Sequence, residues 1–236
     1  MTISADMART VPVNTVQERA VVHHLAFKVT TDEFDAMIAW YQDVLDMEVN
    51  FRGYQRASEV CFLSNDEANH RLVFVTNPAF TRDAEYGGRA RLDHSAFEFP
   101  TVDGLLTKYA YLRDHGIHPY LSIDHGLTIS LYYRDPVGHG VEIQTDALGD
   151  WKLSREWIRA ADEFATNPAG ILFDPDRVID ARNRGAGLEE LHRRIYVQGE
   201  FAPRPDQRQR MHVHVDGPYV WDHGSWGPDH PTFGPH

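Results

Sequence analysis

A short sequence pattern occurs twice in this chain, 70 residues apart. Residues 24–27 read HLAF and residues 94–97 read HSAF, so both copies have the form His-x-Ala-Phe. The same offset aligns apolar side chains at helical spacing over 34–45 and over 102–112. Short β-rich runs follow each helix, at 47–52, 59–63 and 71–76 and then at 118–123, 128–134 and 140–144. The repeat predicts an α+β fold built from paired βαβββ modules.

The alternation of side chains along a strand places the repeated histidines. Alternate residues share a face, so His24 and Ala26 point one way while the residues between them point the other way. His94 and Ala96 repeat this arrangement. We expect the apolar row to pack beneath the helices and both histidines to lie on the opposite, concave face. The small alanine beside each histidine leaves room for a ligand.

A carboxylate stands on the last predicted strand of the second module. Glu142 lies between two apolar residues, and a carboxylate there is costly to bury unless it is paired or bound to a metal. A 2-His-1-carboxylate set occupies one face of an octahedron and leaves positions for substrate and O₂. Taken alone, each histidine could be bonded to backbone and Glu142 could be salt-bridged. Taken together, the repeat favours a metal site with His24, His94 and Glu142 as ligands.

The composition excludes several classes of partner. The chain has 23 Lys and Arg against 35 Asp and Glu, a net charge of −12, and no basic cluster, so nucleic acid would be repelled. Cys61 is the single cysteine, which rules out an intrachain disulfide and suits a reducing compartment. No apolar segment has the length of a signal peptide core or a membrane span. We expect a cytoplasmic protein without a membrane partner.

The chain divides into four regions. We expect an N-terminal arm over 1–20, the paired modules over 21–147, a helical extension over 148–205, and a Pro-, Gly- and His-rich tail over 206–236. Within the extension we expect helices over 151–164, with Ser154 as N-cap, and over 187–196. The extension should pack against the modules rather than form its own core. The tail histidines, expected to be solvated, are His212, His214, His223, His230 and His236.

Residues 21–147 resemble the vicinal oxygen chelate (glyoxalase/dioxygenase-like) superfamily, and within it the one-domain type I extradiol dioxygenases. The resemblance is carried by the strand at His24, by DHSAFE at 93–98, and by S-x-Y-x-x-D-P-x-G-x-x-x-E at 130–142. It implies a non-haem Fe(II) centre, with Mn(II) as the alternative metal, held by His24, His94 and Glu142. It also implies a catechol-type aromatic diol and O₂ as substrates, and a homo-oligomer.

The same family places two further histidines and a tyrosine beside the metal, and the matching positions are His70, His125 and Tyr132. A diol must lose a proton to chelate iron, and imidazole titrates near neutrality. The resemblance implies that His70 is an acid/base near bound oxygen, His125 a hydrogen-bond donor to a substrate or intermediate oxygen, and Tyr132 a partner of the substrate oxygenate. An exposed histidine, a loop histidine and a cross-strand aromatic are the respective alternatives.

The expected activity is O₂-dependent cleavage of an aromatic diol adjacent to its two hydroxyls, in the degradation of aromatic compounds. A glyoxalase-like isomerase or metal-dependent transferase on the same fold is the first alternative. The glyoxalase pattern requires a further carboxylate late in the first repeat, where residues 71–74 offer none. A non-enzymatic small-molecule binding protein is the second alternative, and stoichiometric iron would argue against it.

Overall fold

The computed structural model describes residues 20–82 and 92–205. The predictions for the tail over 206–236, including its histidines, and for almost all of the N-terminal arm over 1–20 lie outside the described residues. The strands of both modules and the extension lie within the described residues, so the predicted ligand strands can be located.

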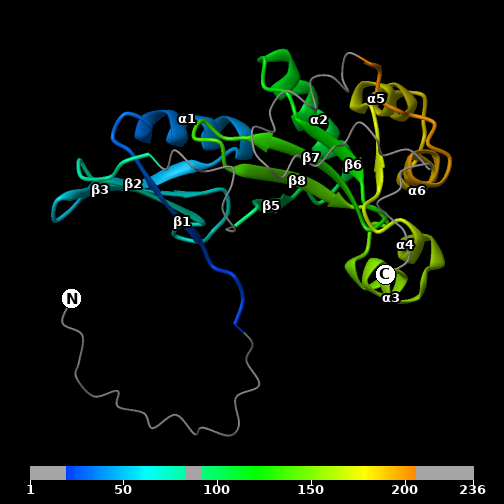
Figure 1. Cartoon of the computed structure of the whole chain (residues 1–236), viewed down its shortest axis with the longest axis horizontal. Coiled ribbons are helices and arrows are strands. Elements are labelled where there is room, and N and C mark those ends of the chain that lie inside the picture. Colours follow the sequence, from blue (N-terminus) through cyan, green and yellow to red (C-terminus); the bar gives the residue numbers. More distant parts are fainter. Residues whose placement is uncertain (1–19, 83–91, 206–236) are drawn as a thin grey trace, which may run out of the picture.

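The first module folds as one strand, one helix and three strands (Figure 1). Its strands form a four-stranded sheet in the order β1-β4-β3-β2. Strand β1 is parallel to β4, and the other neighbours are antiparallel. The elements are β1 (Leu25–Val29), α1 (Phe34–Leu45), β2 (Glu48–Gln55), β3 (Ser58–Ser64) and β4 (Leu72–Thr76).

The second module repeats this topology, which confirms the predicted α+β fold of paired βαβββ modules. Its sheet has the order β5-β8-β7-β6-β9, where the edge strand β9 comes from the extension. Strand β5 is parallel to β8, as β1 is to β4. The elements are β5 (His94–Glu98), α2 (Val102–Asp114), β6 (Leu121–Asp124), β7 (Thr128–Arg134), β8 (Gly140–Asp146) and β9 (Ile171–Leu172).

The helices cover one face of each sheet and leave the other face for the predicted site. Figure 1 shows α1 and α2 on the same side of their sheets. In β1, Phe27 and Val29 are buried against the helical layer, while Ala26 and Lys28 are exposed. The predicted alternation is confirmed within β1, whereas His24 lies one residue before the strand begins.

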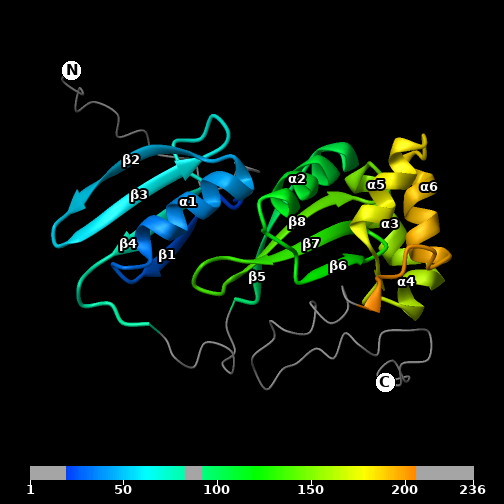
Figure 2. The same cartoon turned by 90° about the horizontal axis from the view of Figure 1, so that it is seen from above.

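The extension gathers at the end of the second module that lies away from the first (Figures 1 and 2). Its side chains join the core of the two modules: Phe173 and Ile195 belong to the same buried cluster as Met37 of α1 and Leu105 of α2. Its elements are α3 (Trp151–Ala160), α4 (Asp162–Thr166), α5 (Pro175–Asn183), α6 (Leu188–His192) and a π-helical turn (Arg193–Val197).

Two details of the predicted extension are wrong. A single helix over 151–164 does not form, because the backbone becomes extended at Ala161 (ψ 122°) and a second helix begins after it. The N-cap is Asp150, whose carboxylate accepts from the N–H of Lys152 at 2.7 Å. Ser154 lies one turn inside the helix, where its hydroxyl donates to Asp146 at 2.5 Å. Both polar residues could cap a helix by propensity, and the earlier one does.

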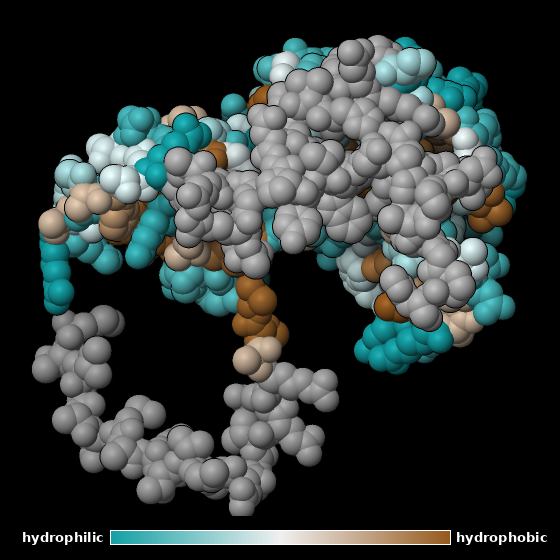
Figure 3. All heavy atoms as spheres, viewed as in Figure 1, coloured by the Kyte–Doolittle hydropathy of each residue, from teal (hydrophilic) through white to brown (hydrophobic). Residues whose placement is uncertain are grey.

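On the face seen in Figure 3, the visible described residues are mainly hydrophilic, with hydrophobic residues in small groups. This distribution is consistent with the net charge of −12. Within the described ranges, no helix combines the length and the apolar character needed to cross a membrane.

A buried aspartate joins the two modules. Asp135, in the turn between β7 and β8, has a fully buried side chain. One of its oxygens accepts from the backbone N–H groups of Val137 and His139, at 3.1 and 2.8 Å. The other accepts from Nδ1 of His139 at 2.8 Å and from the hydroxyl of Tyr41, in α1, at 3.2 Å. Phe27 of β1 lies against the ring of His139, so the turn is fixed to the first module.

We predict that Tyr41→Phe destabilises the chain by about 1.5 kcal/mol, since it removes a hydrogen bond to a buried carboxylate. The free energy of unfolding in urea measures the loss. The matched control is Tyr54→Phe, whose side chain is 75% exposed, and this change should cost less than about 0.5 kcal/mol. Equal effects of the two substitutions would show that the contact between modules contributes nothing to stability.

Candidate metal centre

Strand pairing in the second sheet brings the predicted residues of that module onto one face. Ala96 is the partner of Glu142, and Glu142 is the partner of Tyr132 on its other side. His94 lies two residues before Ala96 and therefore on the same face of β5. Glu142 is only 4% exposed, although its neighbours in β8 point into the core on the other face. The strands thus place a buried carboxylate beside a histidine and a tyrosine.

His94 and Glu142 are in direct contact. Nε2 of His94 lies 3.0 Å from a carboxylate oxygen of Glu142. On the other side of the ring, Nδ1 lies 2.7 Å from the carboxylate of Asp93. The hydrogen bond to Glu142, followed by the one to Asp93, raises the pKa of His94 to about 9. Without a metal, the imidazole therefore carries a proton at pH 7 and pairs with Glu142.

The surroundings of Glu142 keep it ionised. Burial by itself raises the pKa of Glu142, but hydrogen bonds from His94, Ser130 and Tyr132 outweigh burial, and the pKa lies below its usual value. Burial and the charge of Glu142 also raise the pKa of Tyr132, so its hydroxyl remains protonated and can donate. The site combines a carboxylate anion with a phenol that keeps its proton.

His125 completes this part of the site. Its Nδ1 lies 2.6 Å from the carbonyl oxygen of Ala169, and its Nε2 lies 3.0 Å from the hydroxyl of Tyr132. Since a carbonyl only accepts, Nδ1 carries the proton. Burial lowers the pKa of His125, so the neutral Nε2 can accept from the Tyr132 hydroxyl, for whose single proton it competes with Glu142. The donor role expected for His125 therefore requires it to take up a proton first.

His24 and His70 lie together in the first module. Their rings are 4.6 Å apart between centroids, and the ring of His23 lies 5.1 Å from that of His70. Burial, followed by the neighbouring His24 and His23, lowers the pKa of His70. Among the described residues, the one group of three potential ligands whose atoms all lie within 4.8 Å is His23, His24 and His70. His24 does not form such a group with His94 and Glu142.

The donor atoms of the second module are suited to a divalent metal. Ligand atoms that bind at about 2.0–2.2 Å and lie next to each other in an octahedron are separated by about 3 Å. The 3.0 Å between His94 and Glu142 matches this separation. Imidazole nitrogen together with carboxylate oxygen is the donor set of non-haem Fe(II) sites. A metal would replace the proton that the two side chains share.

Asp124 and His192 form a buried pair beside His125 that the sequence did not predict. The carboxylate of Asp124 is fully buried, and it lies 2.8 Å from Nδ1 of His192, in α6, and accepts from the N–H of Gly126 at 2.8 Å. At Gly170 (φ +102°), a Cβ would lie only 2.2 Å from the carbonyl oxygen of Asp124. Glycine therefore allows the extension to approach closely enough for the contact with His125.

No sequence signal pointed to this pair, because Asp124 lies in an ordinary turn motif and its partner is 68 residues away. Nothing in the sequence links His192, in the extension, to Asp124, the residue before His125.

Comparison with known proteins identifies the family. The family model "Glyoxalase/Bleomycin resistance protein/Dioxygenase superfamily" matches residues 21–143, and the chain belongs to this superfamily. The protein is 35% identical over 171 residues to biphenyl-2,3-diol 1,2-dioxygenase 3 of Rhodococcus globerulus, covering 72% of this chain and 87% of the relative. For biphenyl-2,3-diol 1,2-dioxygenase 2 of the same organism the identity is 34%, covering 68% and 82%. The resemblance to extradiol members of the superfamily is thereby confirmed.

The fold also occurs among solved structures. A glyoxalase/bleomycin resistance protein/dioxygenase domain from Frankia sp. EAN1pec aligns with a TM-score of 0.48 and 19% identity, covering 55% of this chain and 99% of that domain.

We predict that His192→Ala destabilises the chain by about 1–3 kcal/mol, because it leaves the buried carboxylate of Asp124 without one of its partners. In a double-mutant cycle, Asp124→Ala combined with His192→Ala should cost less than the sum of the single changes. Urea denaturation of the four chains measures both effects. Additive losses would show that the two side chains do not interact energetically.

We also predict a pH dependence for the chain after metal removal by a chelator. The pKa of His94 is raised from 6.5 to about 9 in the folded state. The resulting stabilisation is complete below about pH 6.5 and is lost as the pH rises through about 9. Free energies of unfolding between these two values measure it, and Glu142→Gln should flatten the slope. The same slope in both chains would mean that another group titrates.

Proposed function

We propose that this chain is an Fe(II)-dependent extradiol dioxygenase that cleaves a catechol-type aromatic diol with O₂. The observation that carries the proposal is the set of His94, Glu142, Tyr132 and His125, which are connected through contacts of 3.0 Å and strand pairing on one sheet face. The names of the two Rhodococcus globerulus relatives support the same reaction.

In this proposal His24, His94 and Glu142 hold the iron, with Mn(II) as the alternative metal. His94 and Glu142 contribute from neighbouring strands of the second module, and His24 contributes from the start of β1. Bound iron would supply electron transfer between the diol and O₂. Three protein ligands would leave further coordination positions open for both substrates.

The side chains around the metal handle the protons of the reaction. A bound diol must lose a proton, and the neutral Nε2 of His125 can take it once the Tyr132 hydroxyl turns from His125 to a substrate oxygen. His125 is then the protonated donor that the family resemblance implies, and it can return the proton to the ring-opened product. His70, whose pKa is lowered, is a neutral base beside His24. Both atoms of O₂ enter the product, and the ring bond beside the hydroxyls breaks.

The open face of the first sheet favours a diol with an aromatic substituent. A shallow, open hollow of about 540 Å³ is lined there by Phe51 and Phe62, together with polar residues. Phe51 pairs with Phe62 across β2 and β3, and Phe62 stacks on the ring of His70 at 4.8 Å. These aromatic side chains lead from the hollow through His70 to His24. A second aryl ring, as in biphenyl-2,3-diol, could pack against them.

The isomerase alternative is less well supported. Strand β4 has the sequence LVFVT and provides no carboxylate where a glyoxalase would need one. An aromatic wall of Phe51 and Phe62 suits an aryl ring better than a small polar substrate.

We predict that the chain, reconstituted anaerobically with Fe(II), consumes O₂ and forms a yellow product with biphenyl-2,3-diol, and reacts more slowly with catechol. His94→Ala and Glu142→Ala should lose both iron and activity. His125→Ala should keep its iron and slow turnover by about 10²–10⁴-fold, the usual contribution of a general acid or base. Oxygen uptake, absorbance and iron analysis provide the measurements.

The matched control is His118→Ala, an exposed histidine of the second module, which should change neither iron content nor rate. Loss of iron from His125→Ala would contradict its assignment as a proton carrier. Iron binding without O₂ uptake for any diol would refute the dioxygenase proposal and favour the isomerase.

A further inference from the structure

Three imidazoles converge at the N-terminal ends of β1 and β4. The ligand nitrogens of His23, His24 and His70 all lie within 4.8 Å of one another. His23 and His24 are exposed and His70 is half-buried, so a metal ion can reach the group from solvent. The proposed catalytic set uses His24, and no role in that set falls to His23.

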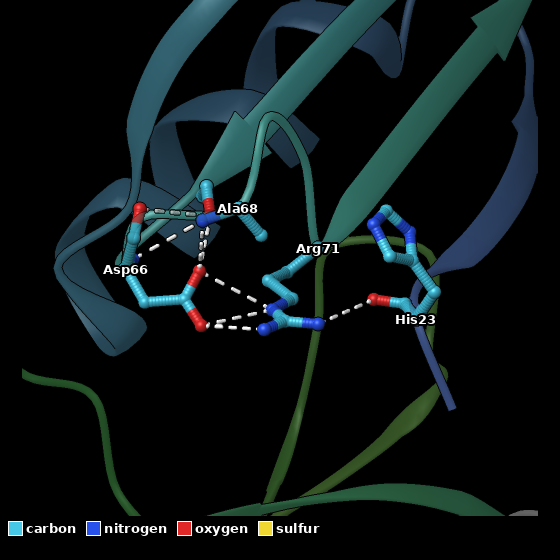
Figure 4. A network of polar contacts seen from close by, with 5 residues as sticks. His23, Asp66, Ala68 and Arg71 are labelled. Carbon is cyan, nitrogen blue, oxygen red and sulfur yellow. Dashed lines mark hydrogen bonds and ion pairs between the residues drawn. The ribbon is translucent and has the colours of Figure 1, made fainter. Parts of the chain in front are cut away.

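The backbone and a charged pair fix this group in place. The N–H of Leu25 donates to the carbonyl of Arg71 at 3.0 Å, which aligns the segment before β1 with the segment before β4. The guanidinium of Arg71 donates to the carbonyl of His23 at 3.1 Å and pairs with the carboxylate of Asp66 (Figure 4). Arg71 thus ties the backbone of His23 to the loop that carries His70.

The spacing and the donor type suit a borderline metal ion. The Nδ1 atoms of His23 and His24 are 3.2 Å apart. Two nitrogens that bind Zn²⁺ at about 2.0–2.1 Å in a tetrahedral site lie about 3.3 Å apart. Neutral imidazole suits Zn, Ni and Cu, and at a given set of ligands Zn²⁺ binds more tightly than Fe²⁺. The group of three imidazoles contains no carboxylate, in contrast to the pair of His94 and Glu142.

The two modules differ at the position before the repeated histidine. In the second module this position is Asp93, whose carboxylate hydrogen-bonds to Nδ1 of His94. In the first module it is His23, which provides a further metal-binding nitrogen next to His24. The preceding residue is therefore a hydrogen-bond acceptor for His94, whereas for His24 it is a second histidine that can bind the same metal ion.

We propose that His23, His24 and His70 form a second, inhibitory site for Zn²⁺ or a similar divalent cation, which competes with the catalytic metal for His24. A neutral imidazole has one nitrogen free to bind a metal. Zn²⁺ in this site therefore withdraws His24 from the catalytic set and removes one of the three iron ligands. The inhibition rests on the function proposed above, whereas the binding of Zn²⁺ to the three histidines does not.

Binding is tested in the full-length chain carrying His94→Ala and Glu142→Ala, which lacks the ligands of the second module. Calorimetry with Zn²⁺ and visible spectra with Co²⁺ should show one equivalent bound with nitrogen ligands. Loss of a residue that only orients a ligand costs about 10–100-fold in metal affinity, so adding His23→Gln should weaken binding at least about tenfold. His118→Gln is the matched control and should leave the affinity unchanged.

Inhibition is tested in the iron-loaded chain with Zn²⁺ added. Zn²⁺ should slow O₂ uptake, and His23→Gln should relieve this effect while leaving the rate without Zn²⁺ unchanged. Equal Co²⁺ affinity with and without His23 would overturn the proposed site. An unchanged Zn²⁺ affinity after His23→Gln would do the same, because it would mean that other histidines bind the ion. Equal inhibition of both chains would overturn the competition for His24. If no chain consumes O₂, the function fails while the Co²⁺ titration still decides the site.

Discussion

The burial of one carboxylate determines the arrangement of the second module. Glu142 stands in the middle of β8 with only 4% of its surface exposed, and a buried ion is costly unless charge and hydrogen bonds compensate for it. His94 and Tyr132 provide this compensation from the two neighbouring strands. The same contacts hold a nitrogen of His94 and an oxygen of Glu142 3.0 Å apart, a spacing that suits the proposed metal site, because a cation could replace the shared proton.

The compensation extends beyond the two modules. Tyr132 contacts His125, and His125 is held by the carbonyl of Ala169 in the extension. Directly beside it, Asp124 is paired with His192 from α6. The residues that orient the site therefore come from both the repeated modules and the segment that follows them. The extension contributes to the position of His125 as well as to the core, which gives a physical reason for its contact with the edge of the second sheet.

Local regularities of the sequence predicted the fold and the faces of the strands. The repeat at 24 and 94 gave the two modules, and the period of two along each strand correctly separated the buried row from the open face. The two β-rich runs at 128–134 and 140–144 correctly placed Tyr132 and Glu142 on neighbouring strands, where they are direct partners. These features depend only on residues close together in the sequence and on the tendency of two strands joined by a short turn to pair. The metal ligand set itself stays a prediction.

Features that depend on distant contacts could not be predicted. The partnership of Asp124 with His192 joins residues 68 positions apart, and the close approach at Gly170 depends on how the extension folds back. The position of His24 relative to His94 depends on the packing between modules, through Tyr41 and Asp135. No periodic pattern encodes such packing, so the sequence predicts three ligands without showing how far apart the modules hold them.

The two repeated histidines differ in how firmly the strand fixes them, and this difference gives a physical basis for placing His24 in both of the proposed metal sites. His94 is the first residue of β5 and pairs with Gly140, where a Cβ would come within 2.9 Å of the His94 side chain. The direction of the His94 side chain is therefore set by the pairing of β5 with β8. His24 precedes the first residue of β1, so strand alternation does not force His23 and His24 to opposite faces. Their nitrogens can meet at 3.2 Å because the strand begins one residue later.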